Sequence, residues 1–309
     1  MRAGSAGVER LVAEIPPATR GRTKLGFLVA CALLLFSACA KSTRAPDVAA
    51  TPGTPVDSAT VALWRMDETG GTRAADAGPS RLDAAAGVDT RTVFGRFRGA
   101  RLFSRSTNSF LYVPYSPLLD LPAALTLEAW IAPNASPRYE DTPIAARWSP
   151  QTADRSWLFC IAGSKLPTDL SEGNGPGWHR EFIQNMQRGR LMFVFQPEEA
   201  SAAHAFFSLR AIELQRWTHV AVTYDGQVVR FWVDGQPDGT YATSGRIRTS
   251  AAPLLVGNFF DTRLLTDFGG DLRQGPAADS VPWYAFDGAI DELRISSVAR
   301  TEFPLHGGR

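Results

Sequence analysis

The chain has 309 residues, and its 32 basic side chains nearly balance its 31 acidic ones, which gives a net charge of +1. This balance lacks the basic excess that nucleic-acid binding requires, so no nucleic-acid partner is expected. Of its 3 cysteines, only Cys160 lies beyond the first 39 residues. The body of the chain therefore forms no internal disulfide and depends on an apolar core.

Residues 1–38 have the organisation of a secretory signal. Basic residues at 22–24 precede an apolar stretch at 25–36, and small residues follow at 37–38. These are the charged, hydrophobic and cleavage regions of such a signal. The apolar stretch is too short to cross a bilayer as a helix, which takes about 20 residues. We therefore expect an exported protein without a permanent transmembrane helix.

The sequence Leu-Phe-Ser-Ala-Cys at 35–39 resembles the bacterial lipobox, in which the cysteine is lipidated and becomes the mature N-terminus. Cys39 is accordingly the expected lipidation site, and the lipid is the only expected contact with the membrane. Ala40, rather than Asp, after the cysteine is typical of outer-membrane sorting. The alternative is an ordinary signal that is cleaved without lipidation. Residues 39–58 hold many Ala, Pro and Thr residues and are predicted to form a flexible linker.

From Thr60 onward the pattern is one of short strands, rich in β-branched and aromatic residues and separated by Gly, Pro, Asn and Asp. The predicted strands cover 61–66, 110–113, 125–131, 157–161, 191–195, 217–224, 228–233, 254–256 and 289–295. This pattern predicts an all-β fold, an antiparallel two-sheet jelly-roll sandwich over residues 59–303. Residues 304–309 are predicted to form a short tail.

One hairpin is especially clear. Asp225-Gly226 separates two predicted strands, and Asp234-Gly235 turns the chain again. An Asp-Gly pair between strands predicts a type I′ turn, because both central residues then need positive φ. Three consecutive strands are thus predicted to form an antiparallel meander. Two long segments, 163–189 and 260–282, do not fit the strand rhythm and are predicted to be insertions.

Seven stretches carry a resemblance to a known family. They cover 61–68, 95–103, 125–133, 217–226, 231–235, 254–257 and 286–295. In this order they look like the laminin-G-like jelly-roll family, within the concanavalin A-like lectin and glucanase superfamily. The resemblance covers residues 60–300 and implies the fold. It does not imply one function, because function lies in loops that are grafted onto such scaffolds.

The resemblance also implies a calcium site. Members of this fold often hold Ca²⁺ with carboxylates from the first and last strands, and calcium prefers such oxygen ligands. The candidate ligands are Asp67, Glu68, Asp287 and Asp291. The alternative is that they are ordinary turn acids, with Asp291 pairing with an arginine. A bound ion is expected to be structural.

Aromatic residues supply the candidate ligand contacts. Alternation along the strands places Trp130, Trp217 and Trp232 on a polar sheet face, where their rings suit stacking on sugars. The alternative is that the insertions bury this face. Aromatic residues on exposed loops are also candidates, because such rings often bind ligands. The loop candidates are Trp178, His179, Trp283 and Tyr284.

Catalytic motifs are not found in the sequence. The superfamily's glucanases carry Glu-x-Asp-x-x-Glu on one strand, which places two carboxylates on the same face, and this chain has no such triplet. Nucleophile-elbow, zinc-helix and phosphate-loop motifs are also missing. We therefore expect a non-catalytic envelope lipoprotein that binds carbohydrate or another surface ligand. The alternatives are a structural or adhesive subunit that binds an envelope protein, and a divergent carbohydrate-active enzyme.

Overall fold

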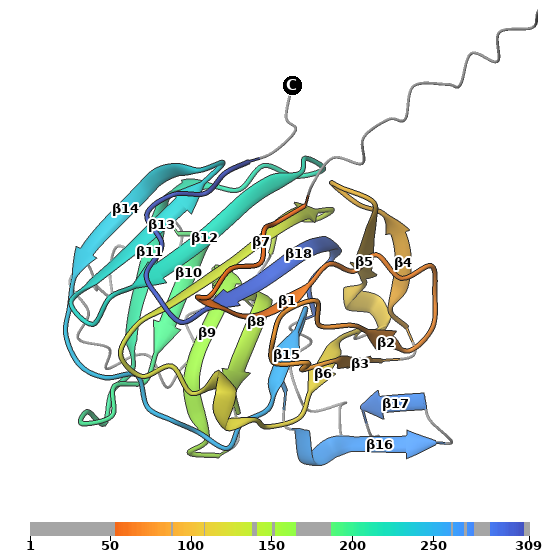
Figure 1. Cartoon of the computed structure of the whole chain (residues 1–309), viewed down its shortest axis with the longest axis horizontal. Coiled ribbons are helices and arrows are strands. Elements are labelled where there is room, and N and C mark those ends of the chain that lie inside the picture. The colour runs from red at the N-terminus through yellow and green to blue at the C-terminus, as the bar shows by residue number, and fades with distance from the viewer. Residues whose placement is uncertain are drawn as a thin grey trace, which may run out of the picture. The chain divides into compact units, whose positions relative to one another are not determined.

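The computed structural model describes residues 53–87, 89–107, 109–137, 141–149, 152–164, 187–260, 262–268, 271–274 and 285–305. These residues form two antiparallel sheets packed face to face, with a separate two-stranded hairpin (Figure 1). The predicted all-β class and two-sheet jelly-roll sandwich are confirmed. None of the helices in these residues is long and apolar enough to cross a membrane.

The first sheet, sheet A, has the strand order β14-β13-β12-β7-β18-β5-β4, and β1 also pairs with β18. Its strands are β1 (Thr60–Trp64), β4 (Arg91–Phe94), β5 (Gly99–Phe103), β7 (Leu125–Pro133), β12 (Thr218–Tyr224), β13 (Val228–Val233), β14 (Gln236–Ala242) and β18 (Gly288–Ser296). The first and last strands are thus neighbours, and β12, β13 and β14 form the predicted meander.

The turns of this meander differ in type from the prediction. Between β12 and β13, Asp225 N–H donates to the Val228 carbonyl, and the central pair is Gly226-Gln227. Only Gly226 of that pair has positive φ, which is the pattern of a type II′ turn. The type I′ pattern occurs one turn later, where Asp234 and Gly235 have φ values of 50° and 70°.

The second sheet, sheet B, has the order β11-β10-β9-β8-β15-β6-β3-β2. Its strands are β2 (Arg73–Ala74), β3 (Ala84–Ala86), β6 (Leu111–Val113), β8 (Thr142–Trp148), β9 (Arg155–Ile161), β10 (Arg190–Phe195), β11 (His204–Ala211) and β15 (Leu254–Val256). The separate hairpin is β16 (Leu265–Phe268) with β17 (Asp271–Gln274), and the 3₁₀ turns are η1 (Arg105–Thr107), η2 (Pro117–Leu119) and η4 (Thr262–Leu264).

The core lies between the two sheets. Alternate side chains of each strand point inward, so Leu127 of β7, Val222 of β12 and Phe193 of β10 belong to one buried cluster. Trp64 is also fully buried there, and its indole N–H donates to the Leu82 carbonyl. Burying a polar group in this way is tolerated only because it is hydrogen-bonded.

Cys160 lies on the opposite face of sheet B, in a second apolar cluster with Leu158, Met192 and Val194. Its thiol is free and fully buried. Burial raises the pKa of this thiol well above its usual value. Because the thiolate is the reactive form, a raised pKa makes Cys160 unreactive.

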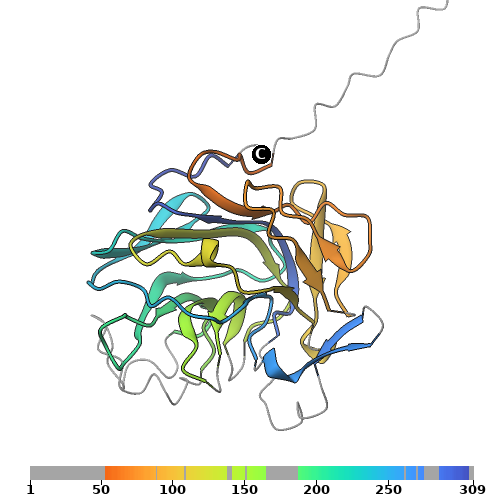
Figure 2. The same cartoon turned by 60° about the horizontal axis from the view of Figure 1, so that its bottom comes forward.

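The described ends of the chain meet beside sheet A. The N-terminal segment (residues 53–59) and the C-terminal segment (residues 297–305) lie at the same side of the molecule (Figure 2). Ser297 N–H donates to the Ala59 carbonyl, and Arg300 pairs with Asp57. The sequence assigned residues up to 58 to the flexible linker, but the packed part of the chain already includes residues 53–58.

Candidate functional site

The outer face of sheet A carries the polar and aromatic residues that alternation predicted. Leu127 and Val220 point into the core, and Glu128, Trp130 and His219 point away from it. Strands β7 and β12 pair directly, with His219 opposite Trp130. Because side chains alternate along a strand, these two neighbouring strands gather the three groups on one surface.

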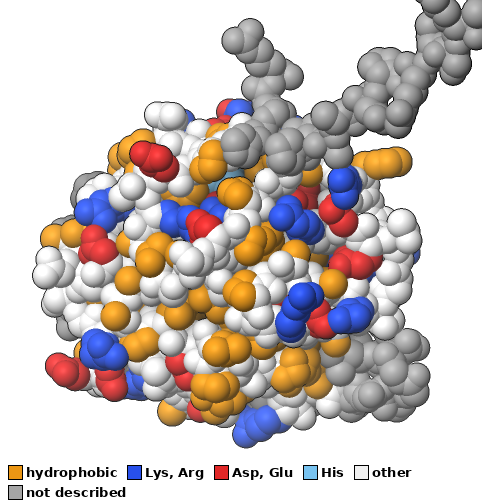
Figure 3. Space-filling model, in the orientation of Figure 1, with side chains coloured by type: hydrophobic (Ala, Val, Ile, Leu, Met, Phe, Trp, Pro, Cys, Tyr) orange, Lys and Arg blue, Asp and Glu red, His pale blue; other side chains and the backbone are white. Residues whose placement is uncertain are grey.

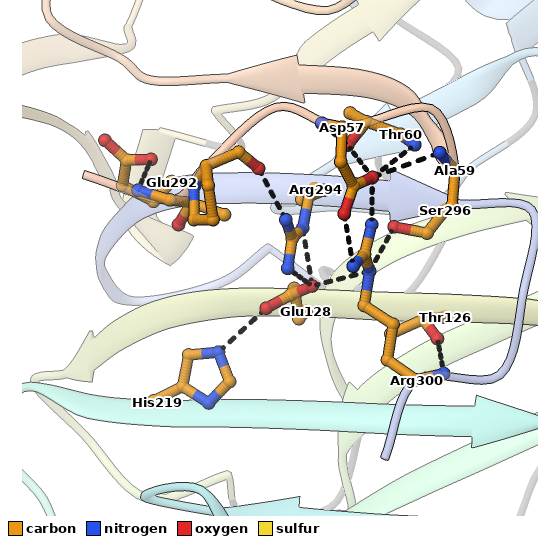
Figure 4. Close-up of polar contacts among 12 residues, drawn as sticks. Asp57, Ala59, Thr60, Thr126, Glu128, His219, Glu292, Arg294, Ser296 and Arg300 are labelled. Carbon is orange, nitrogen blue, oxygen red and sulfur yellow. Dashed lines mark hydrogen bonds and ion pairs between the residues drawn. The ribbon is translucent and has the colours of Figure 1, made fainter. Parts of the chain in front are cut away.

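Glu128 is the centre of an ion network on this face (Figure 4). Atoms Nε and Nη2 of Arg294, from β18, both lie 2.6 Å from Glu128 Oε1. His219 Nε2 donates to the other carboxylate oxygen at 3.1 Å. Arg300 adds a longer contact, with its Nε 3.9 Å from Oε1. The carboxylate thus has charged partners from three separate parts of the chain.

These partners decide the charge of Glu128. Its side chain is only 3% exposed, and burial by itself acts to raise its pKa. The hydrogen bond and charge of His219, together with the Arg294 guanidinium, outweigh burial and hold the pKa of Glu128 below its usual value. Glu128 is therefore a carboxylate near neutral pH, suited to accepting hydrogen bonds and unsuited to donating a proton.

The N-terminal segment is tied to the same network by arginines. Arg294 Nη1 donates to the Pro55 carbonyl at 2.6 Å. Arg300 donates from both terminal nitrogens to the two oxygens of Asp57, at 2.7 and 2.6 Å. This paired contact lowers the pKa of Asp57 strongly. The segment therefore lies fixed over the polar face.

A further arginine, Arg65, holds the start of this segment. Arg65 Nη1 lies 3.1 Å from Glu292 Oε2, and its Nη2 donates to the Thr54 carbonyl. Thr54 N–H donates to the same Glu292 oxygen at 2.8 Å. Glu292 is a buried acid, and burial raises its pKa although Arg65 and Thr54 N–H act to lower it.

Aromatic rings complete the cover of the outer face. The Arg96 guanidinium lies 4.7 Å from the Trp130 ring centre, and Phe97 meets the same ring edge-on. Phe303 of the C-terminal segment lies 5.3 Å from both Trp232 and His219. As a result, Trp130 is only 6% exposed and Trp232 only 8%.

The space that remains at this site is small. A cavity of about 10 Å³ lies among Glu128, Trp130, His219 and the two terminal segments, which is room for about one water molecule. A sugar ring therefore has no place against Trp130 or Trp232. Trp217, which precedes β12, is partly exposed. Trp130 and Trp232 are thus buried, but the side chains seen to cover them come from the terminal segments and from Arg96 and Phe97, and not from the insertions that the sequence alternative named.

A family match accompanies this architecture. Residues 105–303 match the Laminin_G_3 family model, described as the concanavalin A-like lectin/glucanases superfamily. The match covers more than half of the chain. The chain belongs to this superfamily. The resemblance seen in the sequence is thereby confirmed at the level of the superfamily, and the lectin-like character of the fold is established. No curated protein matches the sequence.

Several solved structures are similar to this superfamily member. The binding domain of Paraclostridial Mosquitocidal Protein 1 has a TM-score of 0.48 and 11% sequence identity, and the match covers 77% of this chain and 48% of that one. Domain 4 of AbnA, a GH43 extracellular arabinanase from Geobacillus stearothermophilus in complex with arabinotriose, has a TM-score of 0.49 and 15% identity over 78% of this chain and 93% of that one. The binding domain of botulinum neurotoxin serotype G has a TM-score of 0.47 and 12% identity over 78% and 48%. This chain spans about half the length of the two toxin binding domains.

The calcium ligands that the superfamily resemblance implied are not all brought together. Asp291 is fully buried, and its Oδ2 accepts from Phe97 N–H while its Oδ1 has no hydrogen-bond partner. Burial, with the nearby charges of Glu292 and Asp67, raises the pKa of Asp291 to about 7. Asp67 is thus close enough to Asp291 for electrostatic coupling, and it accepts from Gly99 N–H.

The other two predicted ligands have different surroundings. Glu68 accepts from Ala75 N–H and lies 3.5 Å from Arg101 Nη2, so an arginine already balances its charge. Asp287 offers its carbonyl to Asn134 N–H. Within the residues that the structure describes, no three acidic, His or Cys side chains converge as a metal ion requires. The predicted calcium site of Asp67, Glu68, Asp287 and Asp291 stays a prediction.

Five candidate residues of this superfamily member lie outside the described residues. They are Cys39, Trp178, His179, Trp283 and Tyr284. Sequence reasoning in turn missed Arg294, Arg300 and Asp57, which hold the covered face together. Arg294 could have been noticed in the sequence, because it is an arginine beside inward-facing residues of a predicted strand. No local pattern points to the pairing of Arg300 with Asp57.

Proposed function

We propose that this chain is a non-catalytic carbohydrate-binding protein of the bacterial cell envelope. Its membership of the concanavalin A-like lectin/glucanases superfamily over residues 105–303 carries the proposal. The two-sheet sandwich supplies a rigid scaffold, on which a binding site requires only loop residues. Which loop residues serve is a separate question, because the aromatic face of sheet A is covered.

The state of Glu128 supports a non-catalytic role. A glycosidase acid needs a raised pKa and room for the scissile bond. The pKa of Glu128 is instead lowered, and the cavity beside it has room for about one water molecule. Glu128 thus lacks both requirements.

The N-terminal sequence supports the envelope part of the proposal. Lipid on Cys39 would anchor the protein, with outer-membrane sorting favoured by Ala40. The described part of the chain starts at Gly53, and if the residues between it and Cys39 form the predicted flexible linker, a chain of about 14 residues has an r.m.s. reach of roughly 20 Å. Labelling of cells with radioactive palmitate tests the anchor. Wild-type protein is expected to incorporate label, the Cys39→Ala variant none, and unlabelled wild-type protein would contradict it.

A second candidate function is adhesion to an envelope protein. Its support is the set of large apolar side chains on the surface, of which Phe94 at the sheet edge is 96% exposed. Exposed apolar groups of this kind often mark protein contacts. Binding to glycans and binding to a protein give opposite results in the following experiment.

A glycan array probed with the purified full chain tests the proposed function. Binding to at least one defined glycan, competed by the same glycan in solution, is the expected result. The Phe94→Ala variant serves as a matched control, since it removes an exposed ring without touching the fold. Folded wild-type protein that binds no glycan, together with an envelope protein that co-purifies with it and not with Phe94→Ala, would favour the adhesive function instead.

A further inference from the structure

Tyr115 is an aromatic residue that is open to solvent at the end of the sandwich. It lies between β6 and η2, and its side chain is 48% exposed, beside Leu118 at 52%. Hydrophobic side chains gather at the lower part of the view in Figure 3, where this connection runs. Large apolar groups that remain exposed on a loop need a physical reason.

The loop that carries Tyr115 is locally rigid. Pro114 and Pro117 restrict the backbone on either side. Ser116 caps η2, with its side chain accepting from Leu118 N–H at 3.3 Å. Leu119, the end of η2, is buried in the core and anchors the loop from beneath. The ring thus has a defined position without being covered.

A buried arginine supports one side of the ring. The Arg147 guanidinium lies over the Tyr115 ring, 5.8 Å from its centre. It is fully buried and held by the carbonyls of Leu119 and Ser250 at 2.6 Å each, and by that of Ala252 at 3.3 Å. Because this cation is held in place, one face of the ring lies toward protein.

Asp120 supplies hydrogen-bond acceptors at the rim of the ring. Its Oδ1 accepts from Arg147 Nη1 at 2.8 Å, and its Oδ2 accepts from the Tyr115 hydroxyl at 3.1 Å. A carboxylate has about four acceptor positions, so roughly two are left for a ligand. The side chain is 15% exposed. The charges of Arg147 and Asp120 balance each other, so the patch favours a neutral ligand.

We propose that Tyr115 and Asp120 form the binding site for a neutral carbohydrate. The apolar C–H face of a sugar ring stacks on the solvent side of Tyr115, and a sugar hydroxyl donates to Asp120. This combination of a fixed ring and a partly used carboxylate matches a molecule with one apolar face and many hydroxyl donors. The inference rests on the proposed function and adds to it the place of binding and the class of sugar.

Affinity electrophoresis of the full chain in gels that contain arabinan, laminarin, mannan or alginate tests the site. The first three polymers are neutral and alginate is acidic. Wild-type protein is expected to be retarded by at least one neutral polymer and not by alginate. Truncation of a central aromatic contact typically weakens binding by about tenfold or more, and Tyr115→Ala is expected to do so with an unchanged melting temperature.

Three variants separate stacking from other effects. Tyr115→Phe keeps the ring and is expected to retain affinity within about threefold, because the lost hydroxyl contacts Asp120 rather than the sugar. Leu118→Ala is expected to have an intermediate effect, since it borders the ring. Phe94→Ala, the matched control at the distant sheet edge, is expected to bind as the wild type does.

The contradicting outcomes fall into distinct groups. Neutral-polymer binding that survives Tyr115→Ala would overturn this site and leave the proposed function intact. Retardation by alginate alone would overturn the neutral ligand. Self-association abolished by Tyr115→Ala, without any polymer effect, would make the patch a protein contact. Folded wild-type protein that no polymer retards and that binds nothing on the glycan array would overturn both proposals.

Discussion

Trp130 on sheet A and Tyr115 at the end of the sandwich are built from the same chemical parts. Each ring faces an arginine guanidinium, Arg96 at 4.7 Å for Trp130 and Arg147 at 5.8 Å for Tyr115, and each has a carboxylate close by. They differ in exposure, which is 6% for Trp130 and 48% for Tyr115. The difference arises because Arg96 and Phe97 cover Trp130 on a face that the chain ends also cross, whereas Tyr115 is left open.

This difference separates stability from binding. A buried ion network is costly to break, because removal of one partner leaves an unpaired charge in the interior. An exposed ring that makes few core contacts contributes little to folding and is free to contact a ligand. We therefore expect substitutions in the two regions to have opposite consequences, and the following experiments are ordered from the largest expected effect to the smallest.

The substitution Glu128→Gln should have the largest effect on stability. It leaves Arg294 without its charge partner in a buried position, and loss of one member of a buried pair typically costs about 3 kcal/mol. For a domain of this size that corresponds to a melting temperature lower by roughly 10 °C. Urea unfolding followed by tryptophan fluorescence measures it. Tyr115→Ala is the control. An equal loss of unfolding free energy in both variants would contradict the expected difference between the two regions.

Acid is expected to weaken the ion network of the covered face. The pKa of Glu128 is lowered on folding from its usual 4.5, so its contribution to stability is complete above pH 4.5 and is lost as the pH falls through the lowered value. Melting temperatures between pH 7 and pH 3 measure this dependence. The curve for Glu128→Gln is expected to be shallower than that of the wild type, and parallel curves would show that Glu128 does not contribute.

Calcium gives a smaller expected effect. If the predicted ligands Asp67, Glu68, Asp287 and Asp291 hold Ca²⁺, a tenfold excess of the ion over its dissociation constant stabilises the fold by about 1.4 kcal/mol. The melting temperature in 10 mM CaCl₂ should then exceed that in EDTA by roughly 3–5 °C. MgCl₂ should not substitute, and the Ca²⁺-dependent shift should vanish in Asp291→Asn. Identical melting temperatures in CaCl₂ and EDTA would remove the proposed site.

Loosening the N-terminal segment is expected to have the smallest effect on stability and to loosen the cover of the outer face of sheet A. Because Asp57 is half-exposed, at 44%, loss of its pair with Arg300 should cost under about 1 kcal/mol. Asp57→Ala in the full chain is nevertheless expected to increase acrylamide quenching of tryptophan fluorescence, since the segment is then held less firmly. Asp225→Ala, which removes a surface pair with Arg230, is the control. Equal quenching in both variants would mean that the segment does not depend on Asp57.

The strands of the two sheets could be predicted from the sequence better than the residues that cover sheet A. Alternation in β7 and β12 correctly separated Leu127 from Glu128 and Val220 from His219. In β18 simple alternation fails, because Ile290 and Leu293 both belong to the core. A register shift between Asp291 and Arg294, with Glu292 at a φ of 51°, restores the inward position. A bulge of this kind has no reliable local signal.

The cover of sheet A depends on contacts between distant residues. Arg294 and Glu128 are 166 positions apart, and Arg300 and Asp57 are 243 apart. Local patterns cannot reveal such pairs, so the sequence left both burial and exposure open for Trp130. Tyr115 was a different omission, because its flanking prolines already marked it as a loop residue of the kind that often binds ligands.

Nuclear magnetic resonance of the full chain tests the contrast most directly. The protein, with labelled tyrosine rings and tryptophan indoles, would be titrated with the glycan that binds best on the array. The resonances of Tyr115 are expected to shift and saturate, while the indole signals of Trp130 and Trp232 stay unchanged. Saturating shifts of the two indoles with Tyr115 unaffected would contradict the account, because the covered face would then be the one that opens to the sugar.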